Sequence, residues 1–411
     1  MKINTYLGAR FFWKGLTFEG KWHFILLLLV LSPFFLPLTR AVLIRIGLRD
    51  ITAFSDYIFW SIALLVCAKR CIYSIRWSDI FLIGGFVSFF YVSPTLYPQS
   101  APYCMEHGDY LIFSCVPLYF IGLIIKINQD SNKMVWISRI TILINYIYLF
   151  TSSMITSYEG SSDDEYNMVM SYRALLPALI IIWNTIEKRI LWDYILMVLS
   201  VFLILSLGTR GPLICLITFI IGYLLFFRNY KYNIIVKTAL VSLFIFLYSF
   251  INSIAIYLKG ISLMLGVSTR IYDSILGNSL ANFEESNGRD MLYEIMINKI
   301  LNDSNGLGYG FFADRQFTPA GEYCHNFELE ILVSFGKYGG GLILLLLLLL
   351  IYKSFNRTIG TPECGLLFAF FCATIMQLQF SGSYTTVPWF WLYLGLCVQV
   401  LRSIKTQKTI L

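Results

Sequence analysis

Charged residues are scarce in this chain of 411 residues, because Asp, Glu, Lys and Arg make up only 13% of it. A soluble domain carries roughly 25%. Hydrophobic residues make up 57%, and the mean hydropathy is +0.69. So large an apolar surface cannot all be buried away from water, so much of it must face lipid. The composition therefore excludes an ordinary soluble domain and indicates an integral membrane protein.

Several features of enzymes and secreted proteins are also missing. Histidine occurs only three times, and neither His23 nor His107 has a partner at metal-ligand spacing. The first apolar segment is followed by further ones and does not end at an Ala-x-Ala-like site, so we expect no cleavable signal peptide.

Glycines recur in two places that favour local structure. The stretch Gly306-x-Gly308-x-Gly310 lacks the Lys-Ser/Thr of a phosphate loop, so a turn-rich loop is expected there. Gly336 and Gly340 form a small-xxx-small pair, which is typical of close helix packing in membranes.

Apolar segments long enough to cross a membrane recur along the chain. A span needs ~20 apolar residues, because the hydrocarbon core is ~30 Å thick. The predicted fold is an all-α polytopic integral membrane protein with about twelve transmembrane helices. The parts are a bundle of about nine spans over 1–258, a long external loop over 259–329, and three spans with a tail over 330–411. The segments lie near 21–38, 51–68, 79–95, 110–127, 135–155, 170–186, 192–208, 211–227, 234–258, 330–352, 363–380 and 384–402.

Lys and Arg predict the orientation, since they stay on the cytoplasmic side. Placing both termini in the cytoplasm leaves cation-free loops at 94–109 and 381–388 outside. The net charge of +7 then follows from topology, and no nucleic-acid partner is expected. The long external loop breaks the rule, because it carries Lys259, Arg270, Arg289, Lys299 and Arg315.

Arg210 is the first candidate for chemistry. It lies in Gly208-Thr209-Arg210-Gly211-Pro212, between two apolar segments. The glycines allow a tight turn, and Pro212 can begin the next helix. An arginine this close to hydrocarbon usually marks function; the alternative is a turn arginine that extends its charge to the membrane surface.

Arg289 is the second candidate. Apolar residues at helical spacing predict an amphipathic helix over 291–301, with Ser286 or Asn287 as its cap. A cation in the first turn opposes the helix dipole, but it suits a site that binds an anion. The alternative is a pairing of Arg289 with Asp290 or Glu294.

His325 is the third candidate. Asn326 is the expected cap of the following helix, with Glu328 and Glu330 in the first turn. A helix N-terminus pushes a histidine toward its neutral form, which can accept a proton. The alternative is an interfacial histidine that is hydrogen-bonded to the backbone.

Three motifs, in this order, resemble those of the O-antigen polymerase and ligase family, membrane glycosyltransferases of bacterial surface polysaccharides. They are Gly208-Thr209-Arg210-Gly211; Gly288-Arg289 with the later Gly306-x-Gly308-x-Gly310; and His325-Asn326 followed by Gly336 and Gly339. The resemblance covers about 190–400, and the first half of the chain matches only in being hydrophobic.

The resemblance implies a GT-C-like fold in the bacterial inner (plasma) membrane, and chemistry without metal or cofactor. The substrate would be an oligosaccharide on undecaprenyl diphosphate, with a chain-length regulator as partner protein. It implies that Arg210 and Arg289 hold the diphosphate and that His325 is the general base. Further substrate-binding residues would be Arg270, Arg315, Asn326 and Tyr323.

Two alternatives stay open at this stage. A ligase would move the glycan onto lipid A-core. Three motifs favour a polymerase: Gly208-Thr209-Arg210-Gly211-Pro212, Ser381-Gly382-Ser383 and Trp389-Phe390-Trp391. A transporter, such as a flippase for the lipid carrier, would need charged residues inside several spans. The expected spans are nearly free of charge, which favours an enzyme.

Overall fold

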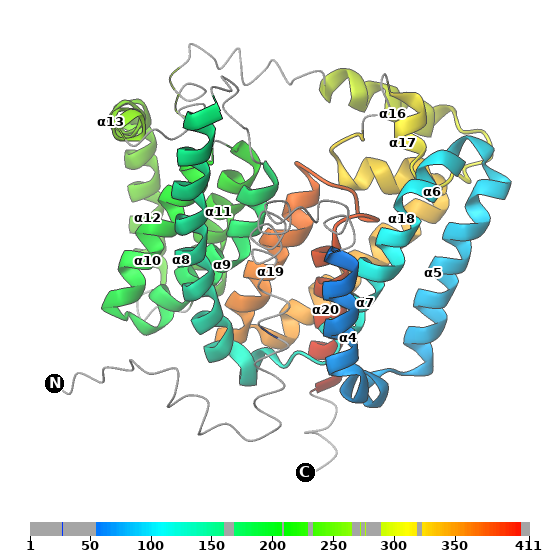
Figure 1. Cartoon of the computed structure of the whole chain (residues 1–411), viewed down its shortest axis with the longest axis horizontal. Helices are drawn as coiled ribbons and strands as arrows, with labels where there is room; N and C mark the ends of the chain where they lie inside the picture. The colour runs from blue at the N-terminus through cyan, green and yellow to red at the C-terminus, as the bar shows by residue number, and fades with distance from the viewer. Residues whose placement is uncertain are drawn as a thin grey trace.

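The computed structural model describes residues 55–159, 168–207, 209–228, 233–264, 289–318 and 323–403, together with Leu27, Tyr272 and Leu276. Within these ranges every regular element is a helix (Figure 1), so the all-α class is confirmed for this part of the chain. The α-helices are α4 (Ser55–Ser74), α5 (Trp77–Leu96), α6 (Ala101–Tyr110), α7 (Val116–Gly122), α8 (Ile127–Glu159), α9 (Met168–Lys188), α10 (Leu191–Ser206), α11 (Arg210–Gly222), α12 (Asn233–Ser249), α13 (Ile251–Met264), α16 (Arg289–Asn302), α17 (Ala313–Phe317), α18 (Phe327–Thr358), α19 (Pro362–Leu378) and α20 (Pro388–Ser403). A short 3₁₀ turn, η2 (Pro98–Ser100), and two π-helical turns, η3 (Leu111–Cys115) and η4 (Tyr223–Phe227), complete the set.

Three described helices are long and apolar enough to cross a membrane. They are α5, α11 continued through η4 (Arg210–Phe227), and α18. Shorter apolar helices are α10, α19 and Ile234–Leu243 within α12. The count of about twelve spans stays a prediction, and the first expected segment, 21–38, lies outside the described residues except for Leu27.

Two of the expected spans are interrupted. The segment expected at 110–127 contains η3 between α6 and α7, and Pro117 lies in the first turn of α7. Proline has no N–H to donate to the preceding turn, which accounts for the irregular turn before it. The segment expected at 234–258 divides into α12 and α13, where the Ser249 hydroxyl bonds back to the Ile245 carbonyl at 3.0 Å.

Two packing centres hold the bundle together. Helix α9 packs against α8, α10, α11 and α19, and α7 packs against α20. At the second contact, a Cβ on Gly122 would lie 2.3 Å from the Leu392 carbonyl oxygen, and one on Gly395 would lie 2.2 Å from the Tyr119 oxygen. These two glycines therefore let the helix backbones approach closely.

One end of the bundle is fastened by ion pairs. Arg402, at the end of α20, donates to both carboxylate oxygens of Asp79 at 2.9 and 2.7 Å. Arg139 forms the same forked contact with buried Asp193, at 2.7 and 2.8 Å. Buried charges need such partners. Figure 1 shows α16 and α17 at the opposite end from the junction of α4 and α5.

Helix α18 is kinked at Gly336, where φ is 73° and ψ is 174°. The segment Gly306–Gly310, here called the glycine loop, packs into this kink, because the Tyr309 and Gly310 amides donate to the Val333 and Ser334 carbonyls, each at 3.0 Å. The expected turn-rich loop is confirmed. The expectation that Gly336 and Gly340 pack against a neighbouring helix is wrong: Gly336 faces the glycine loop, and Gly340 faces the Ile331–Leu332 backbone of its own helix.

Gly336→Ala should destabilise the protein, because its backbone conformation is almost restricted to glycine, at a cost of about 1–3 kcal/mol, and a Cβ there would lie 2.1 Å from the Gly306 carbonyl oxygen. Gly341→Ala is the matched control, since nothing lies within 4 Å of its Cβ position. Thermal unfolding of the detergent-purified protein, followed by size-exclusion chromatography, measures both. Equal midpoints for the two variants would contradict the structural role of the kink.

Candidate functional site

The loop between α19 and α20 brings together the three positions singled out in the sequence. Arg289 donates from Nη2 to the Phe380 carbonyl at 3.5 Å, and the His325 imidazole interacts with the backbone of the same residue. Gly211, next to Arg210, lies so close that a Cβ on it would be 3.2 Å from the Phe380 Cβ. We name Arg210, Arg289 and His325, together with Phe380, the Phe380 cluster.

The start of α11 is shaped by close packing. Thr209 has extended backbone before the helix, and its hydroxyl bonds to that of buried Ser171. A Cβ on Gly211 would lie 2.0 Å from the Tyr172 hydroxyl oxygen, so a larger residue there would have to displace the Tyr172 ring. The predicted tight turn is not tested, because Gly211 lies within α11 and Gly208 lies outside the described residues. Arg210 is the first residue of the helix and is exposed.

Arg289 is the first residue of α16, which confirms the prediction that it lies in the first turn; the expected caps, Ser286 and Asn287, lie outside the described residues. The helix is held down by Leu292 and Met296, which are buried; Met296 packs with Ala313, Cys324 and Val333. The predicted helix over 291–301 is confirmed, but it is only partly amphipathic, because the apolar residues Met291, Ile297 and Leu301 are exposed. The guanidinium at a helix N-terminus combines two features that attract an anion.

His325 lies in the left-handed region, with φ of 52°, where few residues other than glycine are found. Its carbonyl accepts a hydrogen bond from the Tyr293 hydroxyl at 3.4 Å, and the Tyr323 ring centre lies 4.0 Å from the imidazole. Asn326 caps α18 by accepting from the Leu329 amide at 2.9 Å, which confirms that prediction. The left-handed backbone of His325 is a strained conformation, and such strain is common at functional sites.

The pKa of His325 is lowered to about 4, first by burial and second by the Arg289 charge, while the Phe380 backbone acts in the opposite direction. The imidazole is therefore neutral at pH 7. Its Nδ1 atom is buried and has no hydrogen-bond partner among the described residues. A neutral imidazole with an unused ring nitrogen can accept a proton from a bound molecule.

Tyr323, Asn326 and Arg270 are three of the four other residues that were predicted to bind substrate. The Tyr323 hydroxyl is 3.3 Å from the Ser381 hydroxyl, beside Phe380. Asn326 uses its side-chain oxygen in the helix cap. Arg270 lies outside the described residues.

Arg315 is held by α6 and by its own short helix. Its Nη1 lies 2.5 Å from His107 Nε2, and its guanidinium lies 4.8 Å from the centre of the Phe312 ring. Burial and the Arg315 charge lower the pKa of His107. As with Arg289 and His325, the arginine of this pair is charged and the histidine is neutral. These contacts give Arg315 a role in joining α6 to α17.

Two buried carboxylates were not predicted from the sequence. Asp314 accepts from the Cys324 amide, just before His325, at 3.0 Å. Burial raises the pKa of Asp314, against the effects of that amide and Arg315. Glu330 accepts from the Ser383 hydroxyl in the Phe380 loop. Nothing in the spacing around Asp314 indicates a buried acid. Glu330 was predicted to lie in the first turn of its helix, but its burial was not predicted.

The described residues contain no group of three or more His, Cys, Asp or Glu side chains that could hold a metal ion. The Phe380 cluster instead combines fixed positive charge with a proton acceptor. Comparison with known proteins gives no match, whether to a family model, to a curated protein or to a solved structure.

Arg289→Gln should raise the pKa of His325 from about 4 toward the ordinary value of about 6.5, because it removes the second cause of the depression. Histidine ring NMR of the protein in nanodiscs, titrated between pH 3 and 8, measures this. Arg357→Gln, at the end of α18, is the control and should leave the titration unchanged. A His325 titration that is the same in both variants would show that Arg289 does not act on the imidazole.

Proposed function

We propose that this protein polymerises oligosaccharide repeat units carried on undecaprenyl diphosphate, by metal-independent inverting glycosyl transfer at the outer face of a bacterial inner (plasma) membrane. The observation that carries this proposal is the meeting of the Arg289 cation and the neutral His325 imidazole at Phe380, beside the start of α11. The resemblance of the surrounding motifs to the O-antigen polymerase and ligase family supports it.

Arg210 and Arg289 bind the diphosphate in this mechanism. A guanidinium makes bidentate contacts with phosphate oxygens and keeps its charge at all relevant pH values. When the bond between the anomeric carbon and the phosphate oxygen breaks, the electron pair leaves with the diphosphate. The two cations stabilise the charge that develops there, as preorganised donors do in other transferases.

His325 accepts the proton of the attacking sugar hydroxyl. The hydroxyl oxygen bonds to the anomeric carbon as the phosphate oxygen leaves, so a single displacement inverts that carbon. The bound diphosphate offsets the Arg289 charge, which is one cause of the low pKa of His325. Substrate binding therefore makes the imidazole a stronger base.

The alternatives predict other observations. A transporter needs charged side chains along a path through the bundle. The buried acids Asp79 and Asp193 are instead in ion pairs with Arg402 and Arg139, which favours an enzyme. A ligase would share the chemistry of the Phe380 cluster and differ in its acceptor, so it is separated from a polymerase by experiment.

His325→Ala should reduce polymerisation by roughly 10²–10⁴-fold, the usual contribution of a general base. A polymerase-null strain of the source bacterium is complemented with wild type, His325→Ala and the control Arg357→Ala at matched expression, and surface glycan is separated on a gel. Wild type and Arg357→Ala should restore a ladder, and His325→Ala should leave single repeat units.

Two other outcomes of that experiment would contradict the proposal. A full ladder in the null strain would mean that another protein polymerises the glycan. Polymer that accumulates on the carrier lipid in the null strain would identify a ligase.

The pH dependence should differ between kcat/KM and kcat. The neutral imidazole is the active form, so activity is lost as pH falls through the pKa of His325. For kcat/KM, which reports the free enzyme, the loss should be centred near pH 4. For kcat, which reports the substrate complex, the loss should begin at higher pH, because bound diphosphate offsets Arg289. Initial rates with purified enzyme and a lipid-linked repeat unit measure both, and a kcat loss at lower pH than that of kcat/KM would contradict the assigned roles.

A further inference from the structure

The left-handed backbone of His325, with φ of 52°, is held by contacts on both sides of the residue. On the N-terminal side, the Cys324 amide donates to the Asp314 carboxylate at 3.0 Å. On the C-terminal side, Asn326 is fixed by capping α18. A strained backbone conformation persists only where its surroundings hold it. Asp314 therefore fixes the chain directly before the imidazole.

Asp314 is itself placed by the glycine loop. The Gly310 amide donates to the Ser334 carbonyl of α18, and the Gly310 carbonyl accepts from the Ala313 amide at 3.3 Å, where α17 begins. The Asp314 side chain is buried, and its Oδ1 atom has no hydrogen-bond partner among the described residues. A buried acid with an unused oxygen does not favour stability, which indicates a role at the site.

Glu330 holds the other half of the Phe380 cluster. The Ser383 hydroxyl donates to the Glu330 carboxylate and lies 2.7 Å from the Thr385 hydroxyl. All three side chains are buried. Ser383 belongs to the Phe380 loop, which joins α19 to α20 and presents the Phe380 carbonyl to Arg289. Glu330 therefore fixes the loop that anchors the cation.

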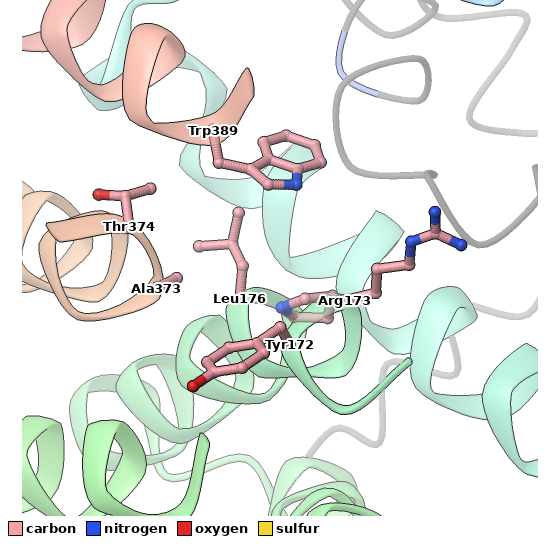
Figure 2. A pocket seen from close by; sticks show the side chains of 7 residues that line it. Tyr172, Arg173, Leu176, Ala373, Thr374 and Trp389 are labelled. Atoms are coloured by element: carbon pink, nitrogen blue, oxygen red, sulfur yellow. The ribbon is translucent and has the colours of Figure 1, made fainter. Parts of the chain in front are cut away.

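The two ends of the Phe380 loop are fixed by helix packing. Figure 2 shows Trp389 at the start of α20, Thr374 near the end of α19, and Leu176 of α9 around one small cavity. The cavity has room for about one water molecule, so the three helices are closely packed there. The middle of the loop, which carries Ser383, needs a contact of its own, and Glu330 provides it.

Glu328 offers a comparison within the first turn of the same helix. Its carboxylate accepts from Gln379 Nε2 at 2.8 Å, also beside the Phe380 loop, but this pair is exposed. Water can replace an exposed hydrogen bond, whereas the loss of a buried partner leaves the other group unsatisfied. Glu330 should therefore matter to the loop, and Glu328 should not.

We propose that Asp314 and Glu330 are positioning residues. Asp314 sets the position of His325 through the Cys324 amide, and Glu330 sets the position of the Phe380 carbonyl through Ser383. Each carboxylate acts through a hydrogen bond that it accepts, so a neutral acceptor of the same shape can replace it. The kinetic consequences rest on the proposed function, but the placement of His325 can be measured without activity.

Kinetics separate the two roles. Asp314→Ala should lower kcat by roughly 10²-fold, the effect of misplacing a catalytic group by about 1 Å. It should leave KM nearly unchanged, because the cations that bind the diphosphate lie on other elements. Glu330→Ala should lower kcat and also raise KM, because its loop holds Arg289. Asp314→Asn and Glu330→Gln should keep wild-type kinetics, since each retains an acceptor oxygen. Glu328→Ala is the matched control and should change neither constant.

Histidine ring NMR of the protein in nanodiscs tests the placement without substrate. The His325 signal, identified by its loss in His325→Ala, should move in Asp314→Ala and in Glu330→Ala. It should stay at its wild-type position in Asp314→Asn, Glu330→Gln and Glu328→Ala. If an alanine variant does not fold, as judged by size-exclusion chromatography, Ser383→Ala removes the second contact from the hydroxyl side and should act like Glu330→Ala.

Three results would overturn the positioning roles. One is wild-type kinetics with an unmoved His325 signal in Asp314→Ala, Glu330→Ala or Ser383→Ala. A second is loss of kcat in Asp314→Asn or Glu330→Gln with an unmoved signal, which would show that the charge is needed and not the hydrogen bond. The third is an equal effect of Glu328→Ala. No activity of wild type, together with the expected movements of the His325 signal, would contradict the proposed function and support the positioning roles.

Discussion

The backbone carbonyl of Phe380 is the point on which the arrangement of the site depends. It accepts from Arg289 at the start of α16, and the imidazole of His325 interacts with the same backbone. The Cβ atom of that residue lies beside Gly211 at the start of α11. Segments far apart in the sequence thus share one anchor in a loop. A carbonyl cannot be removed by substitution, so the anchor stays while side chains around it vary.

The electrostatics of the site follow from this convergence. Arg289 lies close enough to lower the pKa of His325, and burial acts in the same direction. The Arg289 cation and the His325 imidazole form a stable pair only while the imidazole is neutral, since a protonated imidazole would repel the guanidinium. Buried Asp314 and Glu330 then hold the segments that carry His325 and the Phe380 loop. These two acidic groups therefore position the site through hydrogen bonds to Cys324 and Ser383.

Sequence reasoning could find the helices and the charged candidates, because both depend on local patterns. The helix over 291–301, the Asn326 cap and the glycine loop were predicted from spacing and are confirmed. The interruption near Pro117 and the Phe380 anchor could not be predicted. The anchor is a backbone atom, which no residue type reveals. Gly336 was misinterpreted because the spacing of two glycines is the same whether they face a helix or a loop.

The contact between the glycine loop and the kink of α18 has a consequence for how such a sequence can diverge. A side chain at Gly308 would lie 2.3 Å from the Gly336 nitrogen, and one at Gly336 would lie 2.1 Å from the Gly306 oxygen. A substitution at Gly308 or Gly336 would therefore clash with the backbone of the facing segment, and backbone cannot move aside as a flexible side chain can. Related chains can exchange these glycines only by remodelling the loop and the kink together, so an insertion or a different loop length is the more accessible evolutionary route than a series of single substitutions.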